Sequence, residues 1–189
     1  VLLKNGEFWW MPWDKIYRKS FINRINARFP QDTLAEDVIF VVQSLLNDEN
    51  IIYLNNYYGY NWNIFNEEND SSLSHAYTLN TFMKFKSGYE ILFGLLKGNI
   101  KEECFDILFE QFLRSLYSTF CLLNDCDEDC KRELLEELFL FVSSYNLENI
   151  KFTAKWASYF NKLLLKRRFK FLIIQSTIMG EVWKKFISI

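Results

Sequence analysis

Hydrophobic residues recur at helical spacing through most of the second half of the chain. Three apolar stripes, which advance by three or four positions, cover residues 82–96, 105–120 and 134–145. A period of this kind places apolar side chains on one face of a helix. A fourth helix, with a basic face, is expected over 150–170. We therefore predict that residues 75–189 form a helical bundle.

The first 74 residues show a mixed pattern. Helices are expected over 14–26, ending before Pro30, and over 36–47, which begins with an acidic pair. Two short segments, 51–54 and 57–62, have the apolar runs and the alternation of β-strands. The expected fold is therefore α+β and predominantly α, with a boundary between a region 1–74 that has a few short strands and a helical region 75–189.

The composition narrows the class of protein. Of 189 residues, 50% are hydrophobic and 19% aromatic, with only six Gly and two Pro, which excludes disordered and collagen-like chains. Unbroken apolar runs are far too short to cross a bilayer. The four cysteines do not have the spacing of a secreted disulfide framework, and no signal peptide opens the chain. We expect a cytoplasmic protein with reduced thiols.

Charge is unevenly distributed along the chain. Residues 151–189 contain nine Lys or Arg and one acid, Glu181, whereas the chain as a whole carries a net charge of −2. Basic helices with interleaved aromatic residues are typical of membrane-surface anchors, so 151–189 is expected to contact an anionic membrane at its inner face. The alternative is that this segment packs on the acidic helices of its own chain, within 101–148. Nucleic acid is not expected as a partner, because the chain is acidic and has no recognition motif.

Six short motifs follow one another within the first 74 residues. They are Trp13-Asp-Lys15-Ile-Tyr17-Arg18, Phe29-Pro30, Ala35-Glu36-Asp37-Val-Ile-Phe40, Ile51-Ile-Tyr53, Tyr57-Tyr-Gly-Tyr60 and Ser72-Leu-Ser74. This succession resembles the acceptor-side half of family-2 glycosyltransferases of the GT-A fold. In that half, an xKLYR helix, a Phe loop, an EDxxF helix start, a Y-x-Y strand and a Ser-containing loop follow in the same order.

The resemblance implies catalytic roles for the acidic pair. Inverting sugar transfer needs a base that removes the proton of an acceptor hydroxyl as its oxygen attacks the anomeric carbon. In the resembled family the Asp of this pair is the base, which places that role on Asp37, with Glu36 orienting it or touching the acceptor. The helix start should hold Asp37 ionised. The alternative is that the pair only caps a helix.

Further residues near the pair are candidates for substrate binding. Lys15 and Arg18, three positions apart on the expected helix, can attract a diphosphate, or they form a solvated face. Several aromatic side chains can offer faces to a sugar, although a core role is the alternative for each; they are Trp13, Tyr17, Phe29, Phe40, Tyr60 and Trp62. The family often has an Arg after the Y-x-Y strand, where this chain has Asn61-Trp62, so no phosphate contact is carried over there.

The resemblance also implies a divalent metal, Mg or Mn, in the full-length enzyme. The family's metal-binding Asp-x-Asp belongs to a donor-binding half that precedes the region matched here, so its principal ligands are expected outside this chain. His75 is a candidate for one further ligand. Asp125-Cys-Asp127 lies in an acidic break between helices, and Cys126 with Cys130 lacks the second ligand pair of a zinc site.

These features lead to one main prediction and one alternative. The chain is predicted to be part of an inverting, nucleotide-sugar-dependent glycosyltransferase that acts on a glycan or lipid-linked acceptor, as in polysaccharide biosynthesis at a bacterial cell surface. By itself it is expected to be inactive, because the donor half is missing. Strands separated from their sheet invite pairing between copies, so a homodimer is expected. The alternative is a non-catalytic helical interaction or membrane-docking module.

Overall fold

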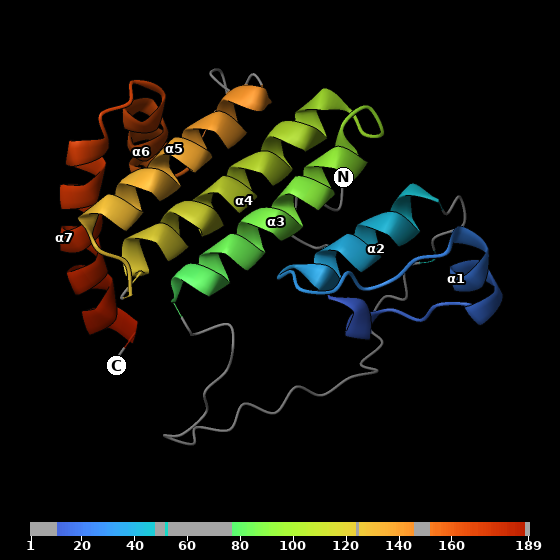
Figure 1. The fold of residues 1–189 in the computed structure, drawn as a ribbon. Coiled ribbons are helices and arrows are strands. Elements are labelled where there is room, and N and C mark those ends of the chain that lie inside the picture. The colour runs from blue at the N-terminus through green and yellow to red at the C-terminus, as the bar shows by residue number, and fades with distance from the viewer. Residues whose placement is uncertain (1–10, 48–51, 53–76, 124, 146–151, 188–189) are drawn as a thin grey trace, which may run out of the picture. The chain divides into compact units, whose positions relative to one another are not determined.

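The computed structural model describes residues 11–47, 52, 77–123, 125–145 and 152–187, and the regular structure in them is helical (Figure 1). A short 3-10 helix, η1 (Pro12–Asp14), comes first. The α-helices are α1 (Lys19–Ile25), α2 (Glu36–Leu46), α3 (Leu79–Leu96), α4 (Glu102–Leu122), α5 (Glu128–Ser144), α6 (Lys155–Leu165) and α7 (Phe169–Ile187).

The predicted α+β class is wrong, because the described residues contain helices and no strand. The strands expected at 51–54 and 57–62 lie outside the described residues except for Ile52, which has no regular structure and is 83% exposed. Alternating polarity is a local signal, whereas a strand is stable only beside other strands. The described part of the chain offers no such neighbour. The expectation of a mainly helical protein is confirmed.

Helix positions agree with the apolar periodicity in most places. The expected helix at 36–47 is α2, and the three apolar stripes became α3, α4 and α5. The helix expected at 14–26 is shorter, since only Lys19–Ile25 is α-helical. The single helix expected at 150–170 is wrong: Arg167, with φ of 53°, adopts a left-handed conformation that ends α6 and separates it from α7.

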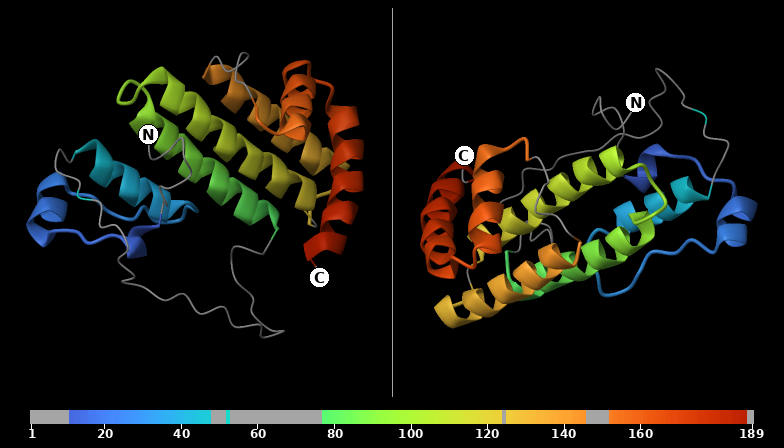
Figure 2. Two further views of the ribbon diagram at one scale, coloured as in Figure 1. Left: turned by 180° about the vertical axis from the view of Figure 1, so that it is seen from behind. Right: turned by 90° about the horizontal axis from the view of Figure 1, so that it is seen from above.

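The chain divides into two compact units. One contains Val1–Ser72 with Lys84–Cys104, and the other contains Leu73–Met83 with Phe105–Ile189. In the second unit, α5, α6 and α7 contact one another pairwise, and both views of Figure 2 show α6 and α7 side by side. None of the helices in the described ranges is long and apolar enough to cross a bilayer.

The core of the second unit is built around aromatic side chains of α4 and α6. The fully buried ring of Tyr117 stacks on Phe160 with centroids 4.2 Å apart. Its hydroxyl donates a hydrogen bond of 2.7 Å to Oδ1 of the buried Asn161. Burial raises the pKa of Tyr117 well above its ordinary value, so this hydroxyl remains a donor. The pair thus satisfies two polar groups inside an apolar core.

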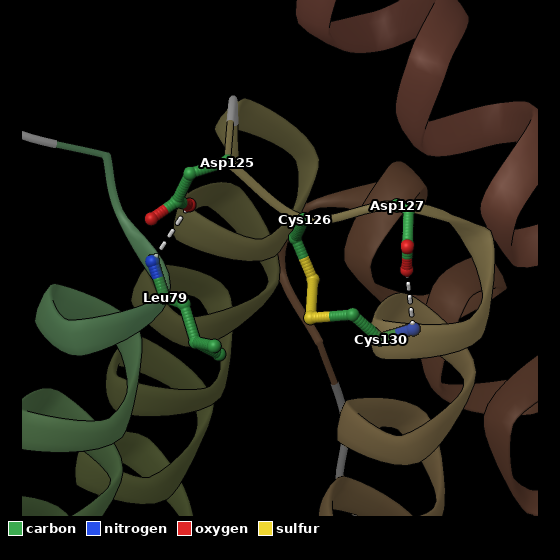
Figure 3. Close-up of a disulfide and its surroundings, with 5 residues drawn as sticks. All are labelled: Leu79, Asp125, Cys126, Asp127 and Cys130. Carbon is green, nitrogen blue, oxygen red and sulfur yellow. Dashed lines mark hydrogen bonds between the residues drawn. A yellow bond between two sulfur atoms is a disulfide. The ribbon is translucent and has the colours of Figure 1, made fainter.

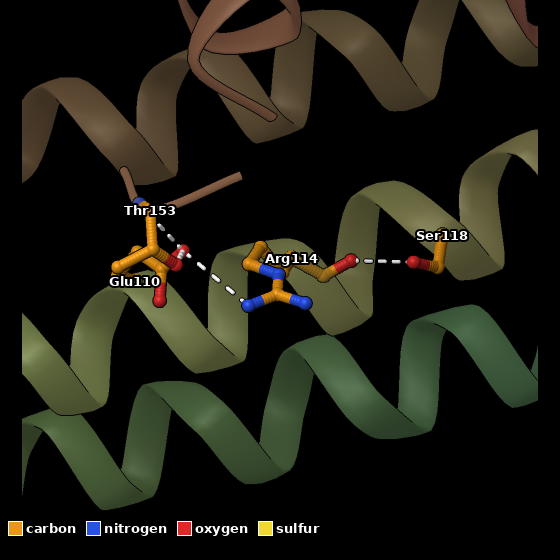
Figure 4. Close-up of polar contacts among 4 residues, drawn as sticks. All are labelled: Glu110, Arg114, Ser118 and Thr153. Atoms are coloured by element: carbon orange, nitrogen blue, oxygen red, sulfur yellow. Dashed lines mark hydrogen bonds and ion pairs between the residues drawn. The ribbon is translucent and has the colours of Figure 1, made fainter. Parts of the chain in front are cut away.

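A buried carboxylate joins the segment before α6 to α4. Glu110 accepts hydrogen bonds from the Thr153 hydroxyl at 2.9 Å and from the Thr153 N–H at 3.2 Å (Figure 4). Arg114, one turn along α4, lies 3.6 Å from the same carboxylate. Arg114 also provides the carbonyl oxygen that accepts the Ser118 hydroxyl at 2.8 Å. The buried Glu110 carboxylate thus has three partners on one oxygen, Oε1, and one of them is a cation.

The break between α4 and α5 contains a disulfide, so the expectation of reduced thiols is wrong for two of the four cysteines. Cys126 and Cys130 are bonded across the start of α5, with Cα atoms 5.5 Å apart (Figure 3). Asp127 caps that helix by accepting the Cys130 N–H at 2.9 Å, and Asp125 accepts the Leu79 N–H at 2.8 Å. Both carboxylates of the Asp-Cys-Asp sequence thus accept hydrogen bonds from N–H groups in the first turn of a helix, Asp125 at α3 and Asp127 at α5.

Candidate functional site

A tight turn before α2 sets the position of the acidic pair. The Leu34 N–H donates to the Lys84 carbonyl of α3 at 3.1 Å. Gly88, one turn further along α3, lies so close to the Leu34 carbonyl that a Cβ atom there would overlap it. The next residue, Ala35, has φ of 67° and is the N-cap of α2. The chain therefore enters α2 from a turn that is fixed against α3.

Glu36 and Asp37 occupy the first turn of α2, as the sequence predicts. Both residues are half-buried. The pKa of Asp37 is raised from its ordinary value. Burial is the larger cause, and the nearby Glu36 carboxylate is the smaller one. The helix start was expected to hold Asp37 firmly ionised, and these two effects act in the opposite direction. A raised carboxylate pKa brings a base closer to neutral pH.

Three segments of the predicted motif meet at Phe40, in the helix that begins with the acidic pair. Phe40 lies three positions after Asp37 on α2, which places the two on adjacent turns of one face. Its ring stacks on Phe29 with centroids 4.3 Å apart, and Tyr17 meets it edge-on at 5.2 Å. Helix α2 also contacts η1 and α1. The separate motifs of the first 40 residues therefore form one aromatic cluster at the start of α2.

Members of this aromatic cluster differ in what they can offer a ligand. Phe40 is buried, with 8% of its surface exposed, so its ring serves mainly to pack Phe29 and Tyr17. Phe29 is 48% exposed and Trp13, in η1, is 47% exposed. Of the two stacked candidates, Phe29 therefore offers an open aromatic surface and Phe40 has the alternative core role.

The hydroxyl of Tyr17 is a polar group without a partner in this cluster. It is buried and has no hydrogen bond among the described residues. Burial, and secondarily Asp14, raise the pKa of Tyr17 to about 12, so the hydroxyl is protonated. Native proteins seldom leave a buried hydroxyl unsatisfied, which makes this atom a candidate for a ligand contact.

Lys15 and Arg18 do not share a helix face, because residues 15–18 lie in the irregular segment between η1 and α1. The Lys15 ammonium is held locally by the Asp14 carboxylate and by the Met11 carbonyl at 3.0 Å. Arg18 is the N-cap residue of α1 and is exposed. Because Lys15 is engaged locally and Arg18 is exposed, Arg18 is the better candidate of the two for binding a phosphate group.

Three candidate residues, Tyr60, Trp62 and His75, lie outside the described residues. Within the described ranges, no group of three or more His, Cys, Asp or Glu side chains is placed to hold a metal ion. The resemblance places the principal ligands of the divalent metal outside this chain, so the metal remains a prediction.

The chain is similar to a protein of known sequence over part of its length. No protein-family model matches the chain, and no solved structure matches it. The chain is similar to the "Ribosomal operon-associated A protein" of Euglena longa, with 31% identity over 136 residues. The match covers 66% of this chain and 25% of that protein, so the chain spans about a quarter of the relative's length. Nothing in these comparisons indicates a glycosyltransferase, and that family remains a prediction from the sequence.

Proposed function

We propose that the first unit is the acceptor side of an inverting glycosyltransferase, with Asp37 as its base. The observation that supports this most is the contact of Tyr17 and Phe29 with Phe40, which follows the half-buried Asp37 by three positions in α2. An isolated helix cap would need neither the exposed ring of Phe29 nor a buried Tyr17 hydroxyl that lacks a partner among the described residues.

The proposed chemistry needs one proton transfer at Asp37. The carboxylate accepts the proton of an acceptor hydroxyl while the hydroxyl oxygen forms a bond to the anomeric carbon. The bond between that carbon and the nucleoside diphosphate breaks on the opposite face, and its electron pair leaves with the diphosphate. Phe29 and Trp13 supply apolar surface for the C–H face of the acceptor sugar, and Glu36 raises the basicity of its neighbour.

The test compares Asp37→Asn with Asp32→Asn in the full-length enzyme, using a panel of nucleotide sugars with glycan and lipid-linked acceptors. Asp32 is an exposed carboxylate with φ of 56°, a conformation that Asn also tolerates, so it is a matched control. Release of nucleoside diphosphate that depends on acceptor should fall at least about a hundredfold in Asp37→Asn and stay unchanged in Asp32→Asn. Equal turnover of the two variants would exclude Asp37 as the base.

A second measurement isolates binding from chemistry. Saturation-transfer NMR of this chain with simple hexosides should show contacts that Phe29→Ala weakens and that Leu140→Ala leaves unchanged. Leu140 is 65% exposed in α5, in the other unit, and serves as the control for loss of exposed apolar surface. A signal that survives Phe29→Ala would contradict the aromatic platform while leaving the assignment of the base intact.

A further inference from the structure

Helices α6 and α7 leave an apolar groove open at the surface of the second unit. Tyr159 of α6 is 55% exposed, and three side chains of α7 are 59–62% exposed. The residues that line the groove are Tyr159, Leu163, Phe171, Ile174, Gln175 and Ile178. Tyr159 and Leu163 lie one turn apart, and the α7 residues follow at intervals of three and four. The groove is therefore formed by one continuous face of each helix.

This exposed face is additional to the faces that build the core. Ala157, Phe160 and Leu164 of α6 are fully buried, as is Leu172 of α7. Both helices contact α5 as well as each other. Folding of the second unit therefore leaves a second apolar surface uncovered, and such surfaces commonly mark interaction sites.

Lysines follow the same face. Lys155, Lys162 and Lys166 lie one turn from Tyr159 or Leu163 along α6, and all three are exposed. Lys170 is exposed beside Phe171 at the start of α7. The segment 152–180 contains six Lys or Arg and no Asp or Glu. The apolar groove thus carries cations along its edges.

The acidic helices of the chain do not neutralise these lysines. Arg167 pairs with the Glu136 carboxylate of α5 and lies over the ring of Phe139 at 4.9 Å. Among the residues that the structure describes, the four lysines on the groove make no ion pair. Packing against α5 therefore neutralises the charge of Arg167. The four lysines stay available to bind an anion outside the chain.

We propose that this surface docks on an anionic lipid membrane. Phe171, Ile174 and Ile178 would enter the boundary between headgroups and acyl chains, with the lysines beside the lipid phosphates. A nucleic acid would also attract the lysines, but it offers stacking to aromatic rings and no apolar phase for exposed isoleucines. The two isoleucines therefore favour lipid. This proposal does not depend on the proposed sugar transfer.

The test is flotation of the purified chain with vesicles of phosphatidylcholine alone or mixed in equal parts with phosphatidylglycerol. The chain should float with the anionic vesicles only, and added salt should weaken binding. Lys162→Gln with Lys166→Gln should weaken the partition coefficient about thirtyfold. Ile174→Ser with Ile178→Ser should weaken it at least about tenfold, although no charge changes.

Matched controls change exposed residues that do not line the groove. Lys101→Gln with Arg132→Gln also removes two charges, and Leu140→Ser removes an exposed aliphatic side chain; both should bind like the original chain. Equal binding to neutral and anionic vesicles, or binding to neither, would overturn the proposal. So would tight binding of a single-stranded RNA that the lysine variant loses and the isoleucine variant keeps, which would assign the surface to nucleic acid.

Discussion

The carbonyl oxygen of Leu34 lies against Gly88 of α3, where a Cβ atom would stand only 1.9 Å from it. The neighbouring Leu34 N–H is hydrogen-bonded to Lys84 of the same helix. The turn that leads into α2 is thus fixed through its backbone, and Asp37 follows it by only three residues. This contact gives a structural reason for a glycine in the middle of a long helix.

We expect Gly88→Ala to destabilise the protein by about 1–3 kcal/mol, because the methyl group must displace backbone rather than a flexible side chain. Gly94, on the same helix, has nothing within 4 Å of its ideal Cβ position and is the matched control. Gly94→Ala should stabilise the helix by about 0.5–1 kcal/mol. Thermal unfolding followed by circular dichroism measures both variants. Equal shifts of the same sign would contradict the close contact.

The raised pKa of Asp37 predicts opposite effects on activity and stability. A carboxyl group whose pKa is higher in the folded than in the unfolded protein contributes stability at low pH, and this contribution is lost as the pH rises through the folded-state pKa. Asp37→Asn should therefore unfold at the same or a slightly higher temperature at neutral pH, while transfer activity is lost. In the unmodified enzyme, activity should rise with pH through a midpoint above the ordinary pKa of an aspartate.

Asp32→Asn supplies the control for both measurements. Asp32 is exposed, so its replacement should leave the pH profile and the unfolding temperature unchanged. Clear destabilisation by Asp37→Asn at neutral pH would indicate that the Asp37 carboxylate serves the fold, as a helix cap does, and would count against its role as a base.

The disulfide predicts a definite thiol count. Titration of the unfolded, unreduced chain should find two thiols, from Cys104 and Cys121, and reduction should raise the number to four. Because the bond closes a short loop, reduction should lower stability by no more than about 2 kcal/mol. Asp127 still caps α5 after reduction, so helix content should persist. Four reactive thiols before reduction would contradict the bond.

Tyr117→Phe tests the polar pair in the core of the second unit. The substitution removes a hydrogen bond of 2.7 Å and leaves the Asn161 carbonyl oxygen buried, which should cost about 1–3 kcal/mol. Tyr159→Phe is the control, since Tyr159 is 55% exposed and its loss of a hydroxyl should change the unfolding free energy little. Urea unfolding compares them. Similar unfolding free energies for both variants would contradict a stabilising role for the pair.

Local sequence signals located most of the helices. Apolar residues at intervals of three and four located α2, α3, α4 and α5, because one buried face of a helix dictates that spacing wherever the helix packs. The acidic pair marked the start of α2 for a similarly local reason, since free N–H groups at a helix start favour carboxylates. The same signals were wrong at 150–170, where Arg167 interrupts an otherwise continuous helical pattern.

The candidate site depended on contacts that no local pattern encodes. Phe29 and Phe40 are eleven positions apart, and only folding showed that the first ring is open while the second is buried beneath it. The same holds for the Tyr17 hydroxyl, whose burial depends on neighbours from other segments. The exposure of a side chain depends on how the chain packs. The sequence could therefore name the candidate aromatic residues but could not tell which of them are open to a ligand.

The amino-acid sequence alone determined the helical character of the chain, the concentration of positive charge in 151–189 and the acidic pair at 36–37, because each is a property of residue type and spacing. Tertiary structure decided the absence of strands from the described residues, the bond between Cys126 and Cys130, and the exposed groove of α6 and α7. These features depend on which segments meet, and the free energy of such contacts arises only when distant parts of the chain pack together.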